Sequence, residues 1–313
     1  MRTIGIDVGG TKVLGVVLSA DAPTDVLIEH RVPTPPGGEG LVAVLAELVD
    51  QLRAEGDVAA VGVGVPGLVD RAGVLRVGPH LPRLRDVPLA DELAARTGVP
   101  VEVDNDANGH AVAEHRGGAA AGVDEALVVS FGTGIGAGII TGGKLLRGAN
   151  GFAGEPGHMI VDPNGPPCPC GRRGCWERFA SGTGLGRLAR DAALGGRLDL
   201  AVDLAGGDPE LVRGEHVTAA ARQNDPDALG VLHELARWIA IGLANLANIV
   251  DPGIIVMGGG LVEAADLLLP PVRTHFGASL MAVDHRPAVP IVPAVLGEQA
   301  GAIGVALLAA ELV

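Results

Sequence analysis

The chain has 313 residues, of which 48% are hydrophobic, and it carries 23 basic and 37 acidic side chains for a formal net charge of −14. This length and apolar share favour a folded chain of two lobes over a single small domain or a disordered segment. The acidic balance argues against nucleic acid or an anionic membrane surface as a partner, because like charges repel.

The first predicted element is a hairpin over residues 3–19, in which two apolar strands flank a glycine-rich turn, TIGIDVGGTKVLGVVLS. Glycines in such a turn let backbone N–H groups approach an anion, and this turn adds a hydroxyl and a charge. Asp7 is placed to hold Mg²⁺ through water. A purely structural hairpin is the alternative for this turn alone. The candidate phosphate site comprises Gly9, Gly10, Thr11 and Lys12.

The next stretch alternates helices and strands. The spacing of Leu and Val predicts a helix over 41–52, and a β-branched run predicts a strand over 58–65. A second helix is expected over 89–96, followed by a short strand over 99–103. Such alternation predicts mixed or parallel sheets covered by helices, in which ligands bind at strand ends.

Three polar residues, Asp104, Asn105 and Asp106, end the strand over 99–103. A carboxylate at a strand tip can accept a proton from an alcohol that attacks a γ-phosphate, and an amide can hold hydroxyl groups. A turn capped by these side chains is the structural alternative. His80 and His110 have no comparable constellation, and we expect surface or structural roles for both.

A second hairpin over 126–142, ALVVSFGTGIGAGIITG, echoes the first. Two hairpins of one design predict two related lobes. The turn at Gly132, Thr133 and Gly134 leads into a strand and not a helix, so it does not match a dinucleotide fingerprint. Paired with the first turn, it predicts two loops that grip one polyphosphate.

Three cysteines, Cys168, Cys170 and Cys175, fall within eight residues. An odd, clustered set argues against a disulfide scaffold and favours a reduced, cytoplasmic setting. Soft thiolates favour Zn²⁺, and His158 as a fourth ligand would close a structural site. Three unliganded thiols are the alternative.

Two glutamates, Glu155 and Glu177, flank the cysteine loop. A zinc-bound His158 would keep one ring N–H for another partner. Carboxylates and a histidine donor around one site suit a polyol such as a sugar. Solvated loop glutamates are the alternative.

The second half of the sequence is richer in helix. A buried strand over 254–257 runs into a third glycine cluster, Gly258, Gly259 and Gly260, and a terminal helix is expected over 298–312. Polar residues interrupt the apolar run over 238–257, so we expect a buried helix and strand there and not a membrane span. The other helical patterns cover residues 216–223, 225–235 and 237–250.

These patterns predict two α/β lobes. The N-terminal lobe covers residues 1–121, with the C-terminal helix over 298–313 packing back on it. The C-terminal lobe covers residues 122–297 and contains the zinc loop.

The combined motifs resemble the ROK family (repressors, open reading frames and kinases), and within it the glucokinases. The likeness extends over essentially the whole chain, and ELARW at 234–238 and GGGL at 258–261 are similar to actinobacterial members. The motif at 168–177 is the zinc signature of the family. The resemblance rests on DVGGTK at 7–12, VDNDAN at 103–108, the segment 127–138, EPGH at 155–158 and CPCGRRGCWE at 168–177.

The resemblance implies an actin-like ATPase fold with two ribonuclease-H-like α/β lobes and a cleft between them. It implies transfer of a phosphoryl group from ATP, with Mg²⁺, to the 6-hydroxyl of glucose, with Asp106 as general base. The phosphates would face the two hairpin turns, the adenosine would face Gly258 to Gly260, and a homodimer or homotetramer is expected. By the same match, the sugar is held by Gly67, Asn105, Asp106, Glu155, Glu177 and His158, the last also a zinc ligand.

One departure from the family pattern is visible, because Pro79-His80-Leu81 stands where the family commonly has Pro-Asn-Leu. It leaves mannose, N-acetylmannosamine, N-acetylglucosamine and fructose open beside glucose, and polyphosphate is open as a donor. A non-catalytic sugar sensor with the same fold is the competing class of function. The repressors of the family carry a helix-turn-helix before the first strand, and with a strand expected from Thr3 we do not expect a repressor.

Overall fold

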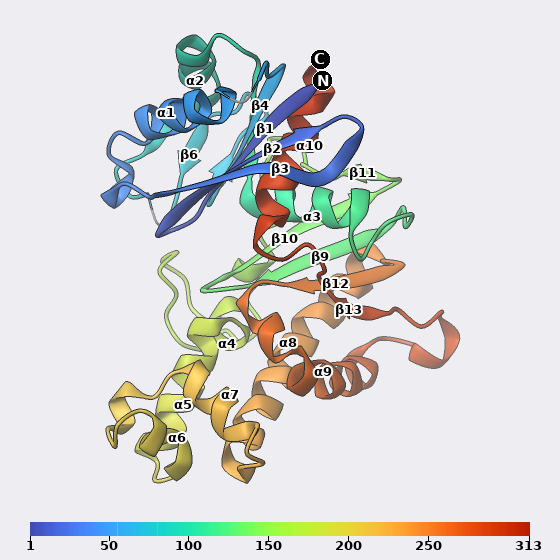
Figure 1. Ribbon diagram of the computed structural model, residues 1–313. Coiled ribbons are helices and arrows are strands. Elements are labelled where there is room, and N and C mark those ends of the chain that lie inside the picture. Colours follow the sequence, from blue (N-terminus) through green and yellow to red (C-terminus); the bar gives the residue numbers. More distant parts are fainter. Residues whose placement is uncertain (55, 80) are drawn as a thin grey trace. The chain divides into compact units, whose positions relative to one another are not determined.

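A computed structural model of the chain describes residues 1–54, 56–79 and 81–313 (Figure 1). Contacts divide the chain into two compact units. Unit 1 comprises Met1–Val129, Ala137–Gly154 and Ala294–Val313, and unit 2 comprises Ser130–Gly136 and Glu155–Pro293. The lobes expected from the sequence are 1–121 with the helix over 298–313, and 122–297, whereas in the structure the strands of the second hairpin run through both units.

Unit 1 is built on a five-stranded sheet with the order β3-β2-β1-β4-β8. The first three strands are antiparallel neighbours, whereas β4 pairs in parallel with β1 and β8 pairs in parallel with β4. Parallel neighbours bring the carboxyl ends of β1, β4 and β8 to one edge of the sheet. The strands are β1 (Arg2–Val8), β2 (Lys12–Ser19), β3 (Ala22–Pro33), β4 (Ala60–Val65) and β8 (Val101–Asn105).

Helices cover both faces of this sheet (Figure 1). On one face, a Cβ on Gly15 would meet the side chains of Leu48 and Leu52 in α1 (Leu41–Arg53). On the other, Gly5 and Gly62 are paired across β1 and β4, and a Cβ on either would lie within 2 Å of a carbonyl oxygen of α10 (Ala300–Ala309). Both positions therefore require glycine, so that α10 can approach the sheet backbone.

The remaining elements of unit 1 are short. Helix α2 (Leu89–Thr97) ends at Gly98 with a φ of 70°, as its sequence predicts, and α3 (Asp106–Gly117) starts directly after β8. A small antiparallel sheet follows β4, with the order β5-β6-β7. Its strands are β5 (Leu68–Val69), β6 (Leu75–Val77) and β7 (Arg85–Val87).

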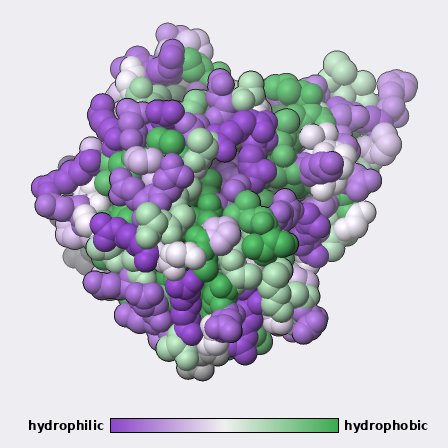
Figure 2. Space-filling view, turned by 90° about the horizontal axis from the view of Figure 1, so that it is seen from above, coloured by the Kyte–Doolittle hydropathy of each residue, from purple (hydrophilic) through white to green (hydrophobic). Residues whose placement is uncertain are grey.

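The core of unit 1 is aliphatic. Ile4, Ile6, Leu45 and Leu48 are fully buried within one cluster, and each side chain of this size contributes about 1.5–3 kcal/mol on burial. The face shown in Figure 2 is largely hydrophilic, with smaller groups of hydrophobic residues between. Among the described residues, no helix combines the length and the apolarity that crossing a membrane requires.

The second five-stranded sheet has the order β11-β10-β9-β12-β13. With β9 in the place of β1, this order repeats that of the first sheet, which agrees with the echo between the two hairpins. Strand β13 pairs in parallel with β12, and β11 pairs antiparallel with β10. The strands are β9 (Ala126–Phe131), β10 (Ile135–Thr141), β11 (Lys144–Leu145), β12 (Ile254–Gly258) and β13 (Ile291–Pro293).

Unit 2 also contains a set of helices, of which α8 (Pro226–Val250) corrects the sequence prediction. One helix of 25 residues stands where two were expected, because Ala236 between them favours helix and no cap or breaker intervenes. Asp225 caps its start by accepting from the Ala228 N–H at 2.8 Å. The other helices are α4 (Glu177–Ala180), α5 (Gly182–Leu194), α6 (Asp199–Leu204), α7 (Gly214–Ala221) and α9 (Ala265–Ser279).

Candidate functional site

The first glycine turn joins β1 to β2. The Gly9 N–H donates to the Lys12 carbonyl at 2.9 Å, and Thr34 Oγ1 donates to the Gly9 carbonyl at 2.7 Å. Gly10 and Thr11 at the tip are exposed. The turn is therefore a fixed loop with accessible backbone N–H groups, which suits an anion.

Asp7 stands at the end of β1 beside residues of α3. A Cβ on Gly301 would lie 2.8 Å from Asp7 Cγ and 2.9 Å from His110 Cδ2, so both side chains lie against Gly301. Burial is the main cause that raises the pKa of Asp7 to about 6. The charge of His110 opposes this rise, the Asp106 carboxylate adds to it, and Lys12 opposes it. His110, for which the sequence indicated no functional role, is thus a neighbour of the candidate Mg²⁺ ligand.

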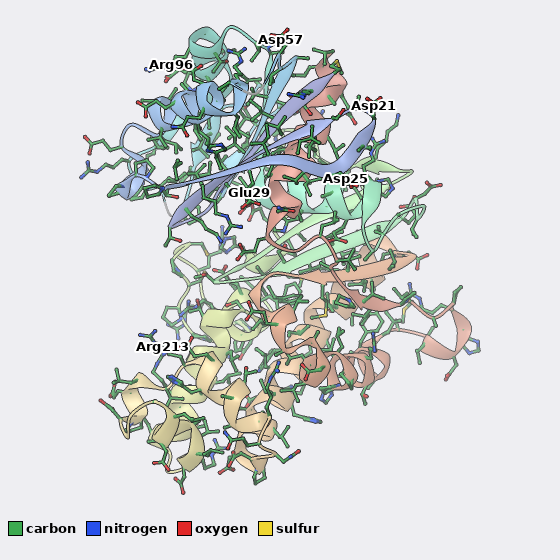
Figure 3. The ribbon with its side chains drawn as sticks, viewed as in Figure 1. Asp21, Asp25, Glu29, Asp57, Arg96 and Arg213 are labelled. Atoms are coloured by element: carbon green, nitrogen blue, oxygen red, sulfur yellow. The ribbon has the colours of Figure 1, made fainter. Side chains whose placement is uncertain are left out.

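Lys12 is engaged in a surface network. Its Nζ donates to Glu298 Oε2 at 2.8 Å, and Arg31 Nη1 donates to the same oxygen at 3.1 Å. Arg31 Nε also donates to Glu29, which is labelled on β3 in Figure 3. Exposed ion pairs of this kind are weak in water, so the pair with Glu298 restrains Lys12 only slightly.

Three of the predicted sugar residues lie together in unit 1. Asn105 Nδ2 donates to the Gly67 carbonyl at 3.1 Å, and Asn105 Oδ1 caps α3 by accepting from the Ala107 N–H at 2.8 Å. Asp106 is the first residue of α3. Gly67 has a φ of 122°, and a Cβ there would lie 2.1 Å from the Val77 carbonyl oxygen, so its backbone conformation requires glycine.

A buried carboxylate, Asp104, supports this group. It is 4% exposed, and its Oδ1 accepts from the Asn105 N–H and from Asn108 Nδ2, both at 2.7 Å. Its Oδ2 accepts from Arg147 Nε at 2.7 Å, and Arg147 Nη2 donates to Glu102 at 3.2 Å. Both carboxylate oxygens of Asp104 thus accept hydrogen bonds, and the Arg147 guanidinium balances the negative charge, as a buried carboxylate requires.

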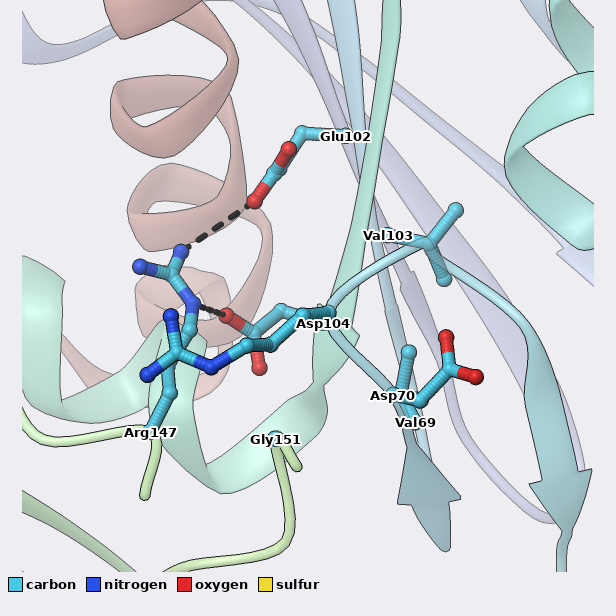
Figure 4. A pocket seen from close by; sticks show the side chains of 8 residues that line it. Val69, Asp70, Glu102, Val103, Asp104, Arg147 and Gly151 are labelled. Carbon is cyan, nitrogen blue, oxygen red and sulfur yellow. Dashed lines mark hydrogen bonds and ion pairs between the residues drawn. The ribbon is translucent and has the colours of Figure 1, made fainter. Parts of the chain in front are cut away.

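A polar cavity of about 130 Å³ lies beside this network (Figure 4). Asp70 and Arg71 line it together with Glu102, Asp104 and Arg147. All of them belong to unit 1.

The predicted metal ligands converge in unit 2. One ligand atom from each of His158, Cys168, Cys170 and Cys175 lies within 4.8 Å of all the others. Cys170 Sγ is 3.6 Å from Cys175 Sγ, and Cys168 Sγ is 3.9 Å from His158 Nδ1. Burial raises the pKa of the Cys168 thiol well above its usual range.

These distances fit a tetrahedral metal. Ligands about 2.3 Å from a central ion lie about 3.8 Å from each other. The Cys170–Cys175 separation of 3.6 Å and the Cys168–His158 separation of 3.9 Å are close to this value. The donor set of three sulfurs and one nitrogen is typical of structural zinc, and the cysteines form no disulfide with each other. The residues present therefore fit a closed metal site.

Both predicted sugar glutamates lie near this cluster along the chain. Glu177 begins α4, and its Oε1 accepts from Cys168 Sγ at 3.1 Å and lies 3.7 Å from His158 Nδ1. The Glu155 carbonyl accepts from the His158 N–H at 3.2 Å. A Cβ on Gly134 would lie 2.8 Å from Glu177 Oε2, so the second glycine turn passes close to this carboxylate.

The second and third glycine clusters also meet within unit 2. Gly259 has a φ of 81°, and a Cβ there would lie within 3 Å of the Phe131 backbone. Gly258 ends β12, while Gly260 and Thr133 are exposed. Two glycine-rich strand ends thus lie side by side in one unit.

The structure brings the candidate residues together as two groups, one in each unit. Sequence reasoning assigned no role to Arg147, named Asn108 only as the last residue of the motif at 103–108, and expected a surface or structural role for His110. His80 lies outside the described residues. The unit 1 group is Asp7, Gly9, Gly10, Thr11, Lys12, Gly67, Asn105 and Asp106, and the unit 2 group is Gly132, Thr133, Gly134, Glu155, His158, Glu177, Gly258, Gly259 and Gly260.

Comparison with known proteins identifies relatives of this arrangement. The model of the ROK family matches residues 3–312. The glucokinase of Streptomyces coelicolor is 40% identical over 312 residues, which cover 99% of this chain and 98% of that protein. The glucokinase of Thermotoga maritima is 36% identical over 318 residues, with the same coverage of both chains.

A solved structure is similarly close. The ROK family glucokinase of Streptomyces griseus, crystallised with glucose and AMPPNP, has a TM-score of 0.89 and 40% identity, and the match covers 99% of this chain and 100% of that one. The likeness confirms the predicted fold class, the two-lobed α/β fold of sugar kinases of this type.

Proposed function

The chain belongs to the ROK family, and from this premise we propose that it is a glucokinase that transfers the terminal phosphoryl group of ATP to the 6-hydroxyl of glucose. The observation that carries the proposal is the likeness over the whole chain to glucokinases, one of them solved with glucose and an ATP analogue. The placement of Asn105 and Asp106 at the carboxyl end of β8 supports it, because ligands in such sheets bind at this edge.

Asp106 is the proposed general base. It accepts the proton of the 6-hydroxyl while that oxygen forms a bond to the γ-phosphorus and the bond to the β-phosphate oxygen breaks, so that ADP leaves. The proton then passes from Asp106 to solvent. Asn105 and the Gly67 backbone hold neighbouring sugar hydroxyls, which orients the nucleophile.

Glu155, His158 and Glu177 are the proposed sugar ligands of unit 2. In the cysteine cluster, Nδ1 of His158 faces the Cys168 thiol. The other ring nitrogen, Nε2, is therefore left to donate to a sugar hydroxyl. We propose zinc as the metal of the Cys₃His set, where it would fix this loop structurally. Its four protein ligands leave no position for substrate, so its role is to order the loop.

The glycine clusters are the proposed ATP site. The turns at residues 9–12 and 132–134 offer backbone N–H groups and hydroxyls to the phosphates, and residues 258–260 face the adenosine. Mg²⁺ bound with ATP would neutralise charge on the transferring group, with Asp7 as its ligand through water. We further propose a cytoplasmic location, since three free cysteines suit a reducing compartment. A homodimer or homotetramer is proposed from the family resemblance alone.

A coupled ADP-release assay tests the function. Glucose, mannose, N-acetylmannosamine, N-acetylglucosamine and fructose are each offered with Mg·ATP. Polyphosphate replaces ATP in a parallel series that is read by the sugar phosphate formed, because that reaction releases no ADP. We expect the highest kcat/KM for glucose with ATP. A higher value for another hexose reassigns the substrate, and glucose binding without any ADP release makes the protein a sugar sensor.

A further inference from the structure

Arg147 links two parts of unit 1 that are distant in sequence. It follows β11, and its Nε reaches Asp104 on β8, 43 residues earlier in the chain, at 2.7 Å. Its Nη2 reaches Glu102 at 3.2 Å. Alternate residues of a strand point to one side, so Glu102 and Asp104 together present two carboxylates to one guanidinium (Figure 4).

Asp104 also forms hydrogen bonds to residues at the start of α3, and so links Arg147 to this helix. Its Oδ1 holds the Asn105 N–H and the Asn108 side chain, which stand on either side of Asp106. Asn108 is fully buried, and its Oδ1 has no hydrogen-bond partner among the described residues. The bond from Nδ2 to Asp104 therefore fixes the orientation of this amide, because a flipped amide would set two acceptor oxygens against each other.

The segment around Arg147 is tied down a second time. Arg71 donates through Nε and Nη2 to the Gly148 carbonyl, and a Cβ on Gly151 would lie 2.7 Å from the Val69 carbonyl oxygen. The segment around Arg147 thus contacts both β5 and β8. It leads directly into Glu155, the first of the proposed sugar ligands in the sequence of unit 2.

We propose that Arg147 is a positioning residue for phosphoryl transfer, which sets the place of Asp106 through Asp104 and Asn108. This inference rests on the proposed function, since it takes Asp106 as the general base. The planar guanidinium suits the task because it donates to two carboxylates at once, which a lysine ammonium does with less defined geometry. A displacement of about 1 Å at a reacting group can cost on the order of 100-fold in rate.

Arg147→Ala is the test variant. We expect kcat to fall about 10- to 100-fold, with the KM for ATP nearly unchanged, because the loss acts on the geometry of the base. The cavity beside Arg147 adjoins the space that the substitution opens, so added guanidinium should restore part of kcat. Sodium or methylammonium chloride at equal ionic strength should not. Arg147→Lys is expected to fall between Arg147→Ala and the wild type.

Arg76→Ala is the matched control, because Arg76 also pairs with two carboxylates, Asp70 and Asp86, but reaches no residue next to Asp106. Its kcat should equal that of the wild type. If Arg147→Ala does not fold, Arg147→Met combined with Asp104→Asn removes the charges of both Arg147 and Asp104, and the remaining Glu102 carboxylate keeps access to solvent because its side chain is 30% exposed. That double variant should fold, show the low kcat and gain nothing from guanidinium.

The outcomes separate the two proposals when Asp106→Asn is measured alongside. A wild-type kcat for Arg147→Ala, or for the double variant, overturns the positioning role. If Asp106→Asn is inactive in the same series, the proposed function still stands. Full activity of Asp106→Asn removes Asp106 as the general base and with it the premise of the positioning role, whereas a wild-type protein that forms no glucose 6-phosphate overturns the function itself. A low kcat of Arg147→Ala that sodium chloride restores as well as guanidinium also overturns the positioning role.

Discussion

The two groups of candidate residues are held in place by different means. In unit 1, the buried carboxylate of Asp104 accepts hydrogen bonds from the Asn105 N–H and from the Asn108 side chain, which flank Asp106 in the sequence. In unit 2, His158 belongs to a loop whose thiols converge on one point. A hydrogen-bonded network is complete once the chain folds, whereas a thiolate cluster is completed by its metal. The placement of Asn105 and Asp106 should therefore be independent of the zinc, whereas the placement of His158 should depend on it.

The largest expected effect comes from Asp106→Asn, which removes the proposed base and leaves its supporting network intact. We expect kcat to fall about 10²- to 10⁴-fold, because proton transfer to a positioned carboxylate contributes by that factor. Glucose affinity, measured by calorimetry, should stay within about threefold because Asn keeps one carbonyl oxygen. Asp91→Asn, which alters an exposed acid in the first turn of α2, is the control. Turnover near the wild-type level would remove Asp106 from its role.

Metal removal tests the other group. Cys175→Ser, or treatment with a chelator, should raise the KM for glucose about 10- to 100-fold and lower the melting temperature, because the loop with His158 loses its anchor. Metal analysis should find one zinc per chain before treatment. Arg173→Ala changes an exposed residue of the same loop and should alter neither quantity. An unchanged KM in metal-free protein would show that the sugar does not depend on this loop.

Glu114→Ala tests the polar support of α3 at its other end. Glu114 is 1% exposed, and its carboxylate accepts from the backbone N–H groups of Ala119, Val295 and Leu296. Removing it leaves these donors without their acceptor, so the free energy of unfolding should fall by about 2–3 kcal/mol. Urea unfolding measures this, with Glu92→Ala on the exposed face of α2 as control. A loss no larger than that of the control would contradict the argument.

The sequence predicted the features that depend on neighbours along the chain. Both hairpins and the Cys₃His cluster are local patterns, and the structure contains them. Helix α3 was missed because DANGHAVAEHRG lacks a clear apolar face, and its helical state depends on the Asn105 cap and on packing against α10. The pairing of Arg147 with Asp104 could not be predicted either, since a buried ion pair over 43 residues leaves no trace in spacing.

The smallest expected effect, a change in stability with pH, distinguishes the two strands that lead into the glycine turns. The echo between the hairpins aligns Asp7 with Ser130, so a half-buried carboxylate in one corresponds to a hydroxyl in the other. Because the pKa of Asp7 is raised from 3.8 to about 6, the native state holds a proton that the unfolded chain releases earlier. The stability that this provides is present below pH 4 and is lost as the pH rises through about 6.

Asp7→Asn should therefore raise the free energy of unfolding at pH 8 by about 1–2 kcal/mol and leave it nearly unchanged at pH 4, with Mg²⁺ absent. A pKa of Asp7 raised from 3.8 to about 6 corresponds to roughly 3 kcal/mol, and the partial exposure of Asp7 lowers the expected gain in stability. Ser130→Ala should change stability equally at both pH values, since a hydroxyl does not titrate there. The same Asp7→Asn protein should lose turnover with Mg·ATP, a gain in stability at the expense of function. Equal stability changes at pH 4 and pH 8 would show that the Asp7 carboxylate carries no burial cost.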